Sequence, residues 1–374
     1  MHARSVAAAA LDGVTGQVWR ETLRPENESI VSWIRGLPGP VAVAYEAGPT
    51  GFGLSRALAA AGVRCVVAAP SKLQRPSGDR VKTDARDAQH LCRLLRLDEV
   101  TAVTVPSVEQ ESARDLVRAR EDCRGDLMRA RHRLSKLLLR HGQVYAVGER
   151  SSAWTTTHDR WLRRLRQDAV ELGWAAGTRS AFDTCYETVQ TVSARRDRLD
   201  DQIAAMAADS EFTPVLRRLC CLRGISTLTG FGLAVEIGDW NRFTGHTIGS
   251  FVGLTPSEHS SGGSRSQGPI AKTGNAHARR LLVEAAWQHR KPYRPGPTLH
   301  DRWKLAPAAA QARADAGNRR LHRRWERFIA REKRGTIAAV AIARELAGWC
   351  WSLATLDNQE VDHENRLIME SIVG

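Results

Sequence analysis

The sequence predicts a mixed fold, with an α/β domain at residues 1–105 and helices over the rest of the chain. Apolar runs at residues 41–46 and 63–69 flank a helical pattern, which is the spacing of a parallel strand–helix–strand unit. After Pro106 the apolar residues recur every three or four positions, as they do in packed helices. A chain of 374 residues is also long enough for two or three domains.

Turn and breaker residues delimit the elements of the first domain. Asp12-Gly13 predicts a hairpin turn between two strands within residues 5–19. Residues 29–37 carry apolar side chains at helical spacing and are followed by Pro38-Gly39-Pro40, which ends the helix. Pro70 ends the last strand. Together these elements predict a mixed sheet with helices packed on it.

Two apolar stripes predict long paired helices in residues 106–212. Both stripes repeat at heptad spacing and are interrupted only by Arg120 and Arg196. Such stripes form either a coiled-coil hairpin within one chain or a seam between two chains. The first comprises Leu116, Cys123, Leu127, Ala130, Leu134 and Leu137, and the second comprises Phe182, Cys185, Val189, Val192, Leu199, Ile203 and Met206.

Residues 219–239 have the form of a helix-hairpin-helix, with Gly224 in the turn. In that motif the backbone N–H groups at the start of the second helix hold a phosphate without reading bases. A tight turn between two helices of a bundle gives the same pattern, so both interpretations stay open.

The charge balance favours a polyanionic partner, and nucleic acid is the first choice. Lys and Arg number 55 against 41 Asp and Glu, which gives a net charge of +14 and a pI of about 10.1. No apolar segment has the length and composition of a signal sequence or an uninterrupted membrane span, so we expect a cytoplasmic protein with no membrane partner. The seven cysteines are scattered without metal-ligand spacing, which predicts neither disulfides nor a zinc site.

One predicted helix carries much of the positive charge. Nine Lys or Arg residues lie between Arg114 and Arg140, against four acidic residues. A charge run of this kind is usually a solvated face, and the functional alternative is a surface that follows nucleic-acid phosphates. The candidate contacts are Arg129, Arg131, Arg133 and Lys136.

Three carboxylates form the first candidate site. Glu46 ends a predicted buried strand, and Thr83 is a plausible N-cap that places Asp84 and Asp87 in the first turn of a helix. Carboxylate oxygens are the ligands that Mg²⁺ prefers, and phosphodiester chemistry uses such ions. Acidic residues in a first turn also complement the helix dipole, which is the structural alternative. The flanking Lys82 and Arg86 are candidate phosphate contacts.

A second candidate site lies in residues 253–280, where small, polar and basic residues form a non-periodic loop ahead of a helix. Flexible linkers are also rich in Gly and Ser. This segment, however, has packed apolar segments on both sides and interleaves four basic residues, which favours a phosphate-handling site. Ser261 or Ser260 is the possible nucleophile. The basic residues are Arg265, Lys272, Arg279 and Arg280.

The ordered set of these motifs resembles the DEDD transposases of the IS110 insertion-sequence family, also called bridge-RNA-guided recombinases. The set runs from Glu46 through Lys82-Thr-Asp-Ala-Arg-Asp87 and a long helical section to Ser260-Ser-Gly262, ahead of Lys272-Thr-Gly-Asn275. The resemblance covers about residues 1–300. Its single motifs are weak, but their order is specific.

The resemblance implies four parts. They are a RuvC-like domain of RNase H fold at residues 1–105, a helical coiled-coil region at 106–212, a transposase domain with the serine loop at 213–300, and a helical extension at 301–374. It further implies DNA strand cleavage and exchange, guided by a structured noncoding RNA, in a homo-oligomer that is a dimer or tetramer.

The resemblance also implies roles for individual residues. Glu46, Asp84 and Asp87 match the second, third and fourth acidic positions of the family, which bind Mg²⁺. Ser261, directly before Gly262, matches the serine that attacks DNA and holds it covalently. Ser260 is the alternative.

The family's first acidic position falls ahead of Met1, two positions before the residue that aligns with His2. Asp12 is no substitute, because a strand of this length holds it about 30 Å from the site. We therefore expect that translation begins upstream, and that the chain as written binds Mg²⁺ weakly and shows little catalysis. Reading the in-frame codons upstream tests this expectation.

Three functions compete at this point. The first is a recombinase that uses the carboxylates and Ser261. The second is a non-catalytic remnant of such an element that still binds nucleic acid through its basic surface. The third is a RuvC-like junction nuclease, which the acidic residues alone permit and the serine-rich loop disfavours. Strand transfer that is lost in Ser261→Ala and in Asp84→Ala separates the first from the second.

Overall fold

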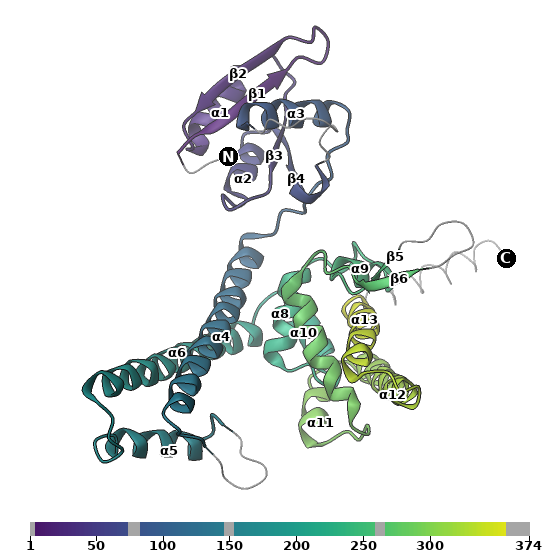
Figure 1. Cartoon of the computed structure of the whole chain (residues 1–374). Helices are drawn as coiled ribbons and strands as arrows, with labels where there is room; N and C mark the ends of the chain where they lie inside the picture. The colour runs from purple at the N-terminus through teal and green to yellow at the C-terminus, as the bar shows by residue number, and fades with distance from the viewer. Residues whose placement is uncertain (1–3, 74–82, 146–152, 259–265, 357–374) are drawn as a thin grey trace, which may run out of the picture. The chain divides into compact units, whose positions relative to one another are not determined.

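The computed structural model describes residues 4–73, 83–145, 153–258 and 266–356, and its elements are labelled in Figure 1. The chain divides into two compact units, Met1–Glu109 and Gln110–Gly374. The first unit combines strands with short helices around one apolar core. The second is mainly helical and holds two apolar cores.

The first unit begins with an antiparallel hairpin. β1 (Val6–Leu11) pairs along its whole length with β2 (Val18–Leu23). The predicted turn at Asp12 is confirmed, because its Oδ1 accepts hydrogen bonds from the backbone N–H of Val14 at 2.7 Å and of Thr15 at 3.1 Å. These bonds hold the pKa of Asp12 below its ordinary value.

A parallel strand–helix–strand unit follows the helix α1 (Asn27–Arg35). β3 (Ala42–Glu46) leads through α2 (Gly53–Ala60) to β4 (Arg64–Ala68), and the two strands pair in parallel as predicted. Glu46 ends β3 opposite Ala68. The two strands therefore finish at the same edge of their sheet, where α/β folds place their ligands.

The two pairs of strands form separate two-stranded sheets within the described part of the chain, so the prediction of one mixed sheet is wrong. Residues of both β1 and β3 line one cavity. The four alanines at residues 7–10 give β1 little side-chain surface to pack, and alanine is a weak strand former. The core of this unit rests instead on larger buried residues such as Ile30, Leu58 and Val67.

The second unit contains a long helical hairpin. α4 (Val108–Arg140), α5 (Thr156–Gln167) and α6 (Ala176–Ala208) share an apolar core that includes most of the two predicted stripes. Arg120 pairs with Asp200 at 2.6 Å, which explains why a charged residue interrupts the first stripe. The two long helices therefore pair within one chain, with α6 antiparallel to α4 (Figure 1).

The segment predicted as a helix-hairpin-helix forms two helices joined by a tight turn, and its identity as that motif stays a prediction. α7 (Thr213–Leu219) is joined to α8 (Thr227–Ile237) by a turn in which Gly224 has φ +86°. A side chain at Gly224 would collide with the backbone oxygen of Ala285. The eight residues from position 230 to 237 of α8 are all buried in the larger core, so this helix is a central element of the bundle. A phosphate contact at its start stays a prediction.

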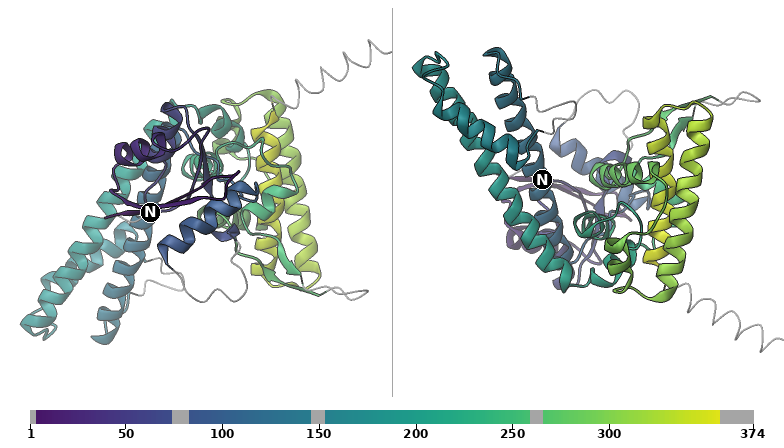
Figure 2. Two further views of the ribbon diagram at one scale, coloured as in Figure 1. Left: turned by 90° about the horizontal axis from the view of Figure 1, so that it is seen from above. Right: turned by 90° about the horizontal axis from the view of Figure 1, so that it is seen from below.

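The rest of the unit continues from α8, packs on it through α10 and ends in a pair of antiparallel helices. The last two helices lie side by side in both views of Figure 2, where they are drawn in yellow and green. The elements in chain order are α9 (Thr247–Phe251), β5 (Pro256–Glu258), β6 (Gln267–Ile270), α10 (Ala276–Ala286), η3 (Trp287–Arg290), α11 (Pro297–Trp303), α12 (Ala308–Ala330) and α13 (Gly335–Ala354).

One helix of the described residues, α13, is long and apolar enough to span a membrane by length and composition alone. Half of its most apolar stretch is buried inside the protein. Ile342, Leu346 and Leu353 belong to the larger core and are fully buried. The apolar character of α13 is therefore explained by its packing in the bundle.

Candidate active site

The first candidate site gathers its carboxylates from two elements of the first unit. Glu46 is the last residue of β3, and its side chain is exposed. Asp84 and Asp87 lie in the first turn of α3 (Asp84–Arg96). Thr83 caps this helix as predicted, because its Oγ1 accepts a hydrogen bond of 3.3 Å from the backbone N–H of Arg86. The cap fixes where the helix starts and hence where both Asp side chains lie.

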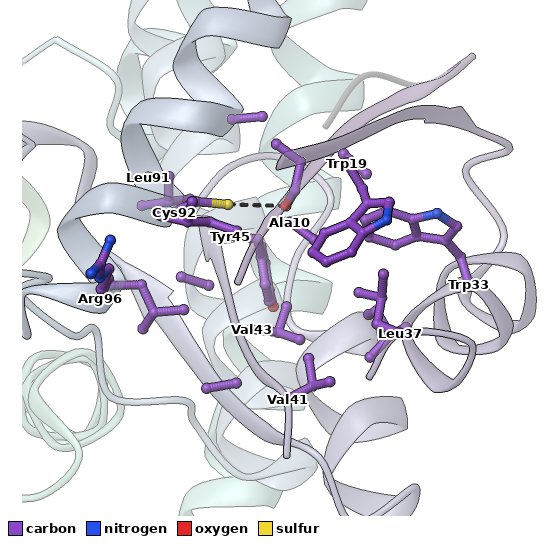
Figure 3. A pocket seen from close by; sticks show the side chains of 18 of the residues that line it. Ala10, Trp19, Trp33, Leu37, Val41, Val43, Tyr45, Leu91, Cys92 and Arg96 are labelled. Atoms are coloured by element: carbon purple, nitrogen blue, oxygen red, sulfur yellow. Dashed lines mark hydrogen bonds between the residues drawn. The ribbon is translucent and has the colours of Figure 1, made fainter. Parts of the chain in front are cut away.

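All three carboxylates line a single cavity of about 750 Å³. Its other walls combine apolar side chains with polar atoms of the chain. Figure 3 shows the rings of Trp19 and Trp33 on one side and Arg96 on the other, with Tyr45 between them. The Cys92 thiol of α3 donates a hydrogen bond of 2.9 Å to a β1 carbonyl, which ties the helix to the hairpin. The carboxylates thus belong to a concave site that also carries apolar side chains.

The same cavity includes two titratable residues that the sequence did not single out as ligands. His90 lies one turn after Asp87 on α3. Asp12 also lines the cavity, next to the charge of Arg96 at the opposite end of α3 from Asp84. The turn at Asp12 is as predicted, whereas the exclusion of Asp12 as a metal ligand stays a prediction.

The donor set suits Mg²⁺ in its chemistry, because three carboxylates offer oxygen ligands and two of them are exposed to the water that completes the shell of this ion. Within the described residues, no three His, Cys, Asp or Glu side chains lie close enough together to hold a metal ion. Glu46, Asp84 and Asp87 therefore share a cavity but do not form a closed ligand set.

The second candidate site is a short hairpin in the second unit. β5 and β6 pair in antiparallel fashion with an irregular register, and residues 259–266 connect them. Ser260, Ser261 and Arg265 lie outside the described residues. The two strands on either side of the serine segment are the described part of this site.

The base of this hairpin is held firmly. Gly253 and Gly274 both have positive φ. A side chain on Gly253 would collide with the backbone of Thr273, and a side chain on Gly274 would collide with the backbone oxygen of Phe251. The Arg279 guanidinium donates hydrogen bonds of 3.0 Å to the carbonyls of Val252 and Thr273, on either side of the hairpin. This predicted phosphate contact thus has a structural task in the protein.

The other predicted basic residues of this segment have different surroundings. Lys272 is exposed, in a left-handed backbone conformation with φ +56°. Arg280 forms ion pairs with Glu121 of α4 and with Glu284 of α10. Lys272 is therefore the described residue of this set with a cation in solvent.

A buried polar cluster that the sequence reasoning missed lies behind the hairpin. Glu236 of α8 is 1% exposed at its side chain and accepts two hydrogen bonds of 2.9 Å from Arg118 and one of 2.8 Å from Asn275. His277 Nδ1 lies 3.1 Å from the same carboxylate. Burial opposes ionisation, but the bonds to His277, Arg118 and Asn275 hold the pKa of Glu236 well below its usual range. Asn275 also caps α10.

The only sequence signal for this cluster was Asn275 in the Lys272-Thr-Gly-Asn segment that carried the family resemblance. Glu236 itself stands in an apolar helix. A buried acidic residue in such a helix is usually paired with a basic or hydrogen-bonding side chain. The cluster joins α4, α8 and α10 at the base of the hairpin.

The basic residues of α4 differ in their surroundings. Arg129 pairs with Asp126, and Arg131 lies over the ring of Trp154 at 5.0 Å. Burial, followed by the charge of Arg196, lowers the pKa of Arg131. Arg133 and Lys136 are exposed. The residues of this set best placed to meet a phosphate are therefore Arg133 and Lys136.

Comparison with known proteins adds independent information. Residues 1–142 match the DEDD transposase family of IS110 elements, and residues 216–303 match the family described as Transposase IS116/IS110/IS902. The protein y4qE of Sinorhizobium fredii, which is named as a transposase, is 38% identical over 311 residues, which are 83% of this chain and 74% of y4qE. The chain belongs to the IS110 transposase family. The transposase of insertion sequence IS1533 from Leptospira borgpetersenii is 29% identical over 341 residues, 89% of this chain and 96% of the relative.

The two matched regions of the transposase coincide with its two candidate sites. The first region contains the carboxylates and continues through α4, and the second contains the hairpin β5–β6 and the cluster around Glu236. The transposase therefore carries both sites within the parts that define its family.

Proposed function

We propose that this transposase cleaves and exchanges DNA strands, with Glu46, Asp84 and Asp87 as Mg²⁺ ligands and Ser261 as the nucleophile. The observation that supports this most directly is that Glu46 lines the same cavity as Asp84 and Asp87, although it is distant from them in sequence. Such a site at the carboxyl ends of parallel strands suits a charged substrate.

The three ligands are positioned by local structure. The parallel register of β3 and β4 fixes the end of β3, and the Thr83 cap fixes the start of α3. When bound, Mg²⁺ neutralises charge that develops on the phosphate oxygens during strand cleavage.

In the proposed covalent step, the Ser261 hydroxyl oxygen attacks the phosphorus of the DNA backbone. A serine–phosphate bond forms, and the bond from phosphorus to one deoxyribose oxygen breaks. The hydroxyl proton passes to a base, and the leaving deoxyribose oxygen takes up a proton. Because the phosphodiester becomes a serine phosphodiester, its energy is kept for rejoining to a second strand without a cofactor that supplies energy.

The remaining parts of the proposal concern partners. A net charge of +14 and the exposed cations Arg133 and Lys136 support binding of DNA and of a structured guide RNA. We further propose that the protein works as a homo-oligomer in the cytoplasm. The family membership supports the DNA partner, and the charge supports any nucleic acid.

Strand exchange on DNA that carries matched element ends tests the proposal, with the protein extended upstream to its expected start assayed beside the chain as written. Asp84→Asn and Ser261→Ala should each reduce the product by on the order of 100-fold or more, because each removes a group with a direct role. Glu99→Gln, which removes an exposed carboxylate of the same unit, should not. A trapped protein–DNA adduct should map to Ser261, and mapping to Ser260 would replace the nucleophile within the same proposal.

The outcomes separate the alternatives. DNA junction cleavage that survives Ser261→Ala would identify a RuvC-like nuclease instead. Tight binding without cleavage by any version of the protein, supplied with Mg²⁺ and matched ends, would identify a nucleic-acid-binding remnant.

A further inference from the structure

We propose that the exposed cationic face at the end of α12 is a second surface for the phosphodiester backbone of a double-helical nucleic acid. We call it the C-terminal basic face. It consists of Arg323, Arg327, Arg331, Lys333 and Arg334. It lies beyond residues 216–303 and residues 1–142, the two regions matched by the families. The inference rests on the proposed nucleic-acid partner and adds a site that neither the carboxylates nor the serine hairpin includes.

The spacing of the face follows from helix geometry. Arg323, Arg327 and Arg331 are four residues apart, so they lie on one side of the helix and follow one another at about 6 Å along its axis. Leu321 and Trp325 of the same helix are buried in the core. The core contacts therefore fix the rotation of α12, and the three arginines are held outside as a row.

These cations have no carboxylate partner among the described residues, whereas their neighbours do. Arg320 and Arg324 both pair with Glu345, and Arg319 pairs with Asp315 at 2.9 Å. Over residues 308–334 there are nine Lys or Arg and three Asp or Glu, a surplus of six positive charges. The protein thus neutralises one part of the helix and leaves the C-terminal basic face open.

Helix stability does not account for the face. Cations at a helix C-terminus interact favourably with the helix dipole, which explains Arg327 and Arg331. Lys333 and Arg334, however, immediately precede α13, where a cation is unfavourable, and Arg334 is the N-cap residue. Like charges four residues apart also repel each other on a helix. A polyanion relieves all of these repulsions at once, because each cation can neutralise a phosphate.

The side chains beside the face suit a polyanion better than a protein. The row of arginines offers planar guanidinium groups, which bind phosphate oxygens in pairs. Large apolar side chains next to it are few, with Ile329 49% exposed. The buried core of a protein–protein interface is depleted in charged residues, while a nucleic-acid backbone binds a row of cations.

The test compares two variants of the full chain that lose the same charge. Arg323→Gln/Arg327→Gln/Arg331→Gln removes the row, and Gln is a good helix former. Arg160→Gln/Arg164→Gln/Arg198→Gln removes three exposed arginines of α5 and α6 that have no carboxylate partner among the described residues. Binding of a DNA duplex and of a double-stranded RNA, each of about 30 base pairs, is measured over about 50–200 mM salt. Thermal melting checks that both variants fold.

For at least one of the two duplexes, the first variant should lower the slope of log K against log salt by roughly 2 to 3, since each lost phosphate contact contributes about 0.9 on B-DNA. The matched control should change it by less than about 1. A loss confined to DNA or to RNA identifies the partner. Equal losses in the two variants, or no loss in either, would overturn the proposal. Asp84→Asn should keep the slope, so failure of strand exchange and failure of this surface are distinguishable.

Discussion

The carboxylate of Glu236 on α8 accepts two hydrogen bonds of 2.9 Å from the guanidinium of Arg118 on α4. Glu236 is buried, while the side chain of Arg118 is 56% exposed. The pair is therefore a charged connection between a core helix and the long hairpin. It also holds Asn275 and His277 in place at the start of α10.

Glu236→Gln should lower the free energy of unfolding by about 2 kcal/mol, because it replaces charge-assisted hydrogen bonds by neutral ones and leaves a donor group facing Arg118. Urea unfolding measures this. Glu284→Gln removes a carboxylate that is 59% exposed, and the loss should stay below about 0.5 kcal/mol. An equal loss of unfolding free energy in the two variants would show that the hydrogen bonds of Glu236 stabilise the protein no more than an exposed ion pair does.

The second prediction concerns acid stability. Burial, and then the charge of Arg223, lowers the pKa of His289 to about 4 from 6.5, so the folded protein keeps this side chain neutral while the unfolded chain takes up a proton. Stability is complete above pH 6.5 and falls as the pH drops toward 4, by up to about 3 kcal/mol.

Replacing the buried ring tests this. His289→Leu should flatten the decline in unfolding free energy between about pH 6.5 and pH 4, measured by urea titration at several pH values. The exposed His132 provides the control, since His132→Gln should keep the decline. An unchanged pH profile in His289→Leu would show that other groups cause the acid sensitivity.

The third prediction concerns the base of the serine hairpin. Gly274 has φ +71°, and a Cβ there would collide with the backbone oxygen of Phe251. Gly274→Ala should therefore cost about 2 kcal/mol or more in unfolding free energy. Gly296→Ala, at a position with open space, should be nearly neutral. Equal melting temperatures for the two variants would contradict the tight geometry of this turn.

The fourth prediction separates the binding and packing roles of α4. Arg133→Gln/Lys136→Gln should lower the salt slope of DNA binding by about 2 and keep the melting temperature. Arg131→Gln should instead lower the melting temperature, because it loses the contact with Trp154. If the double variant binds DNA like the wild type, Arg133 and Lys136 do not contact phosphates and this part of the helix is only a solvated surface.

The local elements of the fold were predictable, because each depends on residues close in sequence. Asp12 makes its turn through its own neighbours, and Thr83 caps its helix through the N–H of Arg86. The end of β3 at Glu46 followed from an apolar run and its boundary. These positions together predicted most of the carboxylate site.

The non-local parts were not predictable from spacing. The separation of β1 from β3 depends on how two alanine-containing strands pack across a cavity. The cluster around Glu236 brings together residues more than a hundred positions apart, and nothing in the local pattern of Arg118 indicates its partner. For the same reason, the sequence did not predict that Arg279 binds backbone carbonyls or that Arg280 forms an ion pair with Glu121.

The length of α4 has a physical consequence of its own. It is one unbroken helix of 33 residues, which corresponds to a stiff rod of about 50 Å. On the scale of duplex DNA, which rises about 3.4 Å per base pair, such a rod measures roughly 15 base pairs. Within the second unit, the side chains along residues 110–140 of this helix are therefore held at fixed separations, which a break in the helix would not provide.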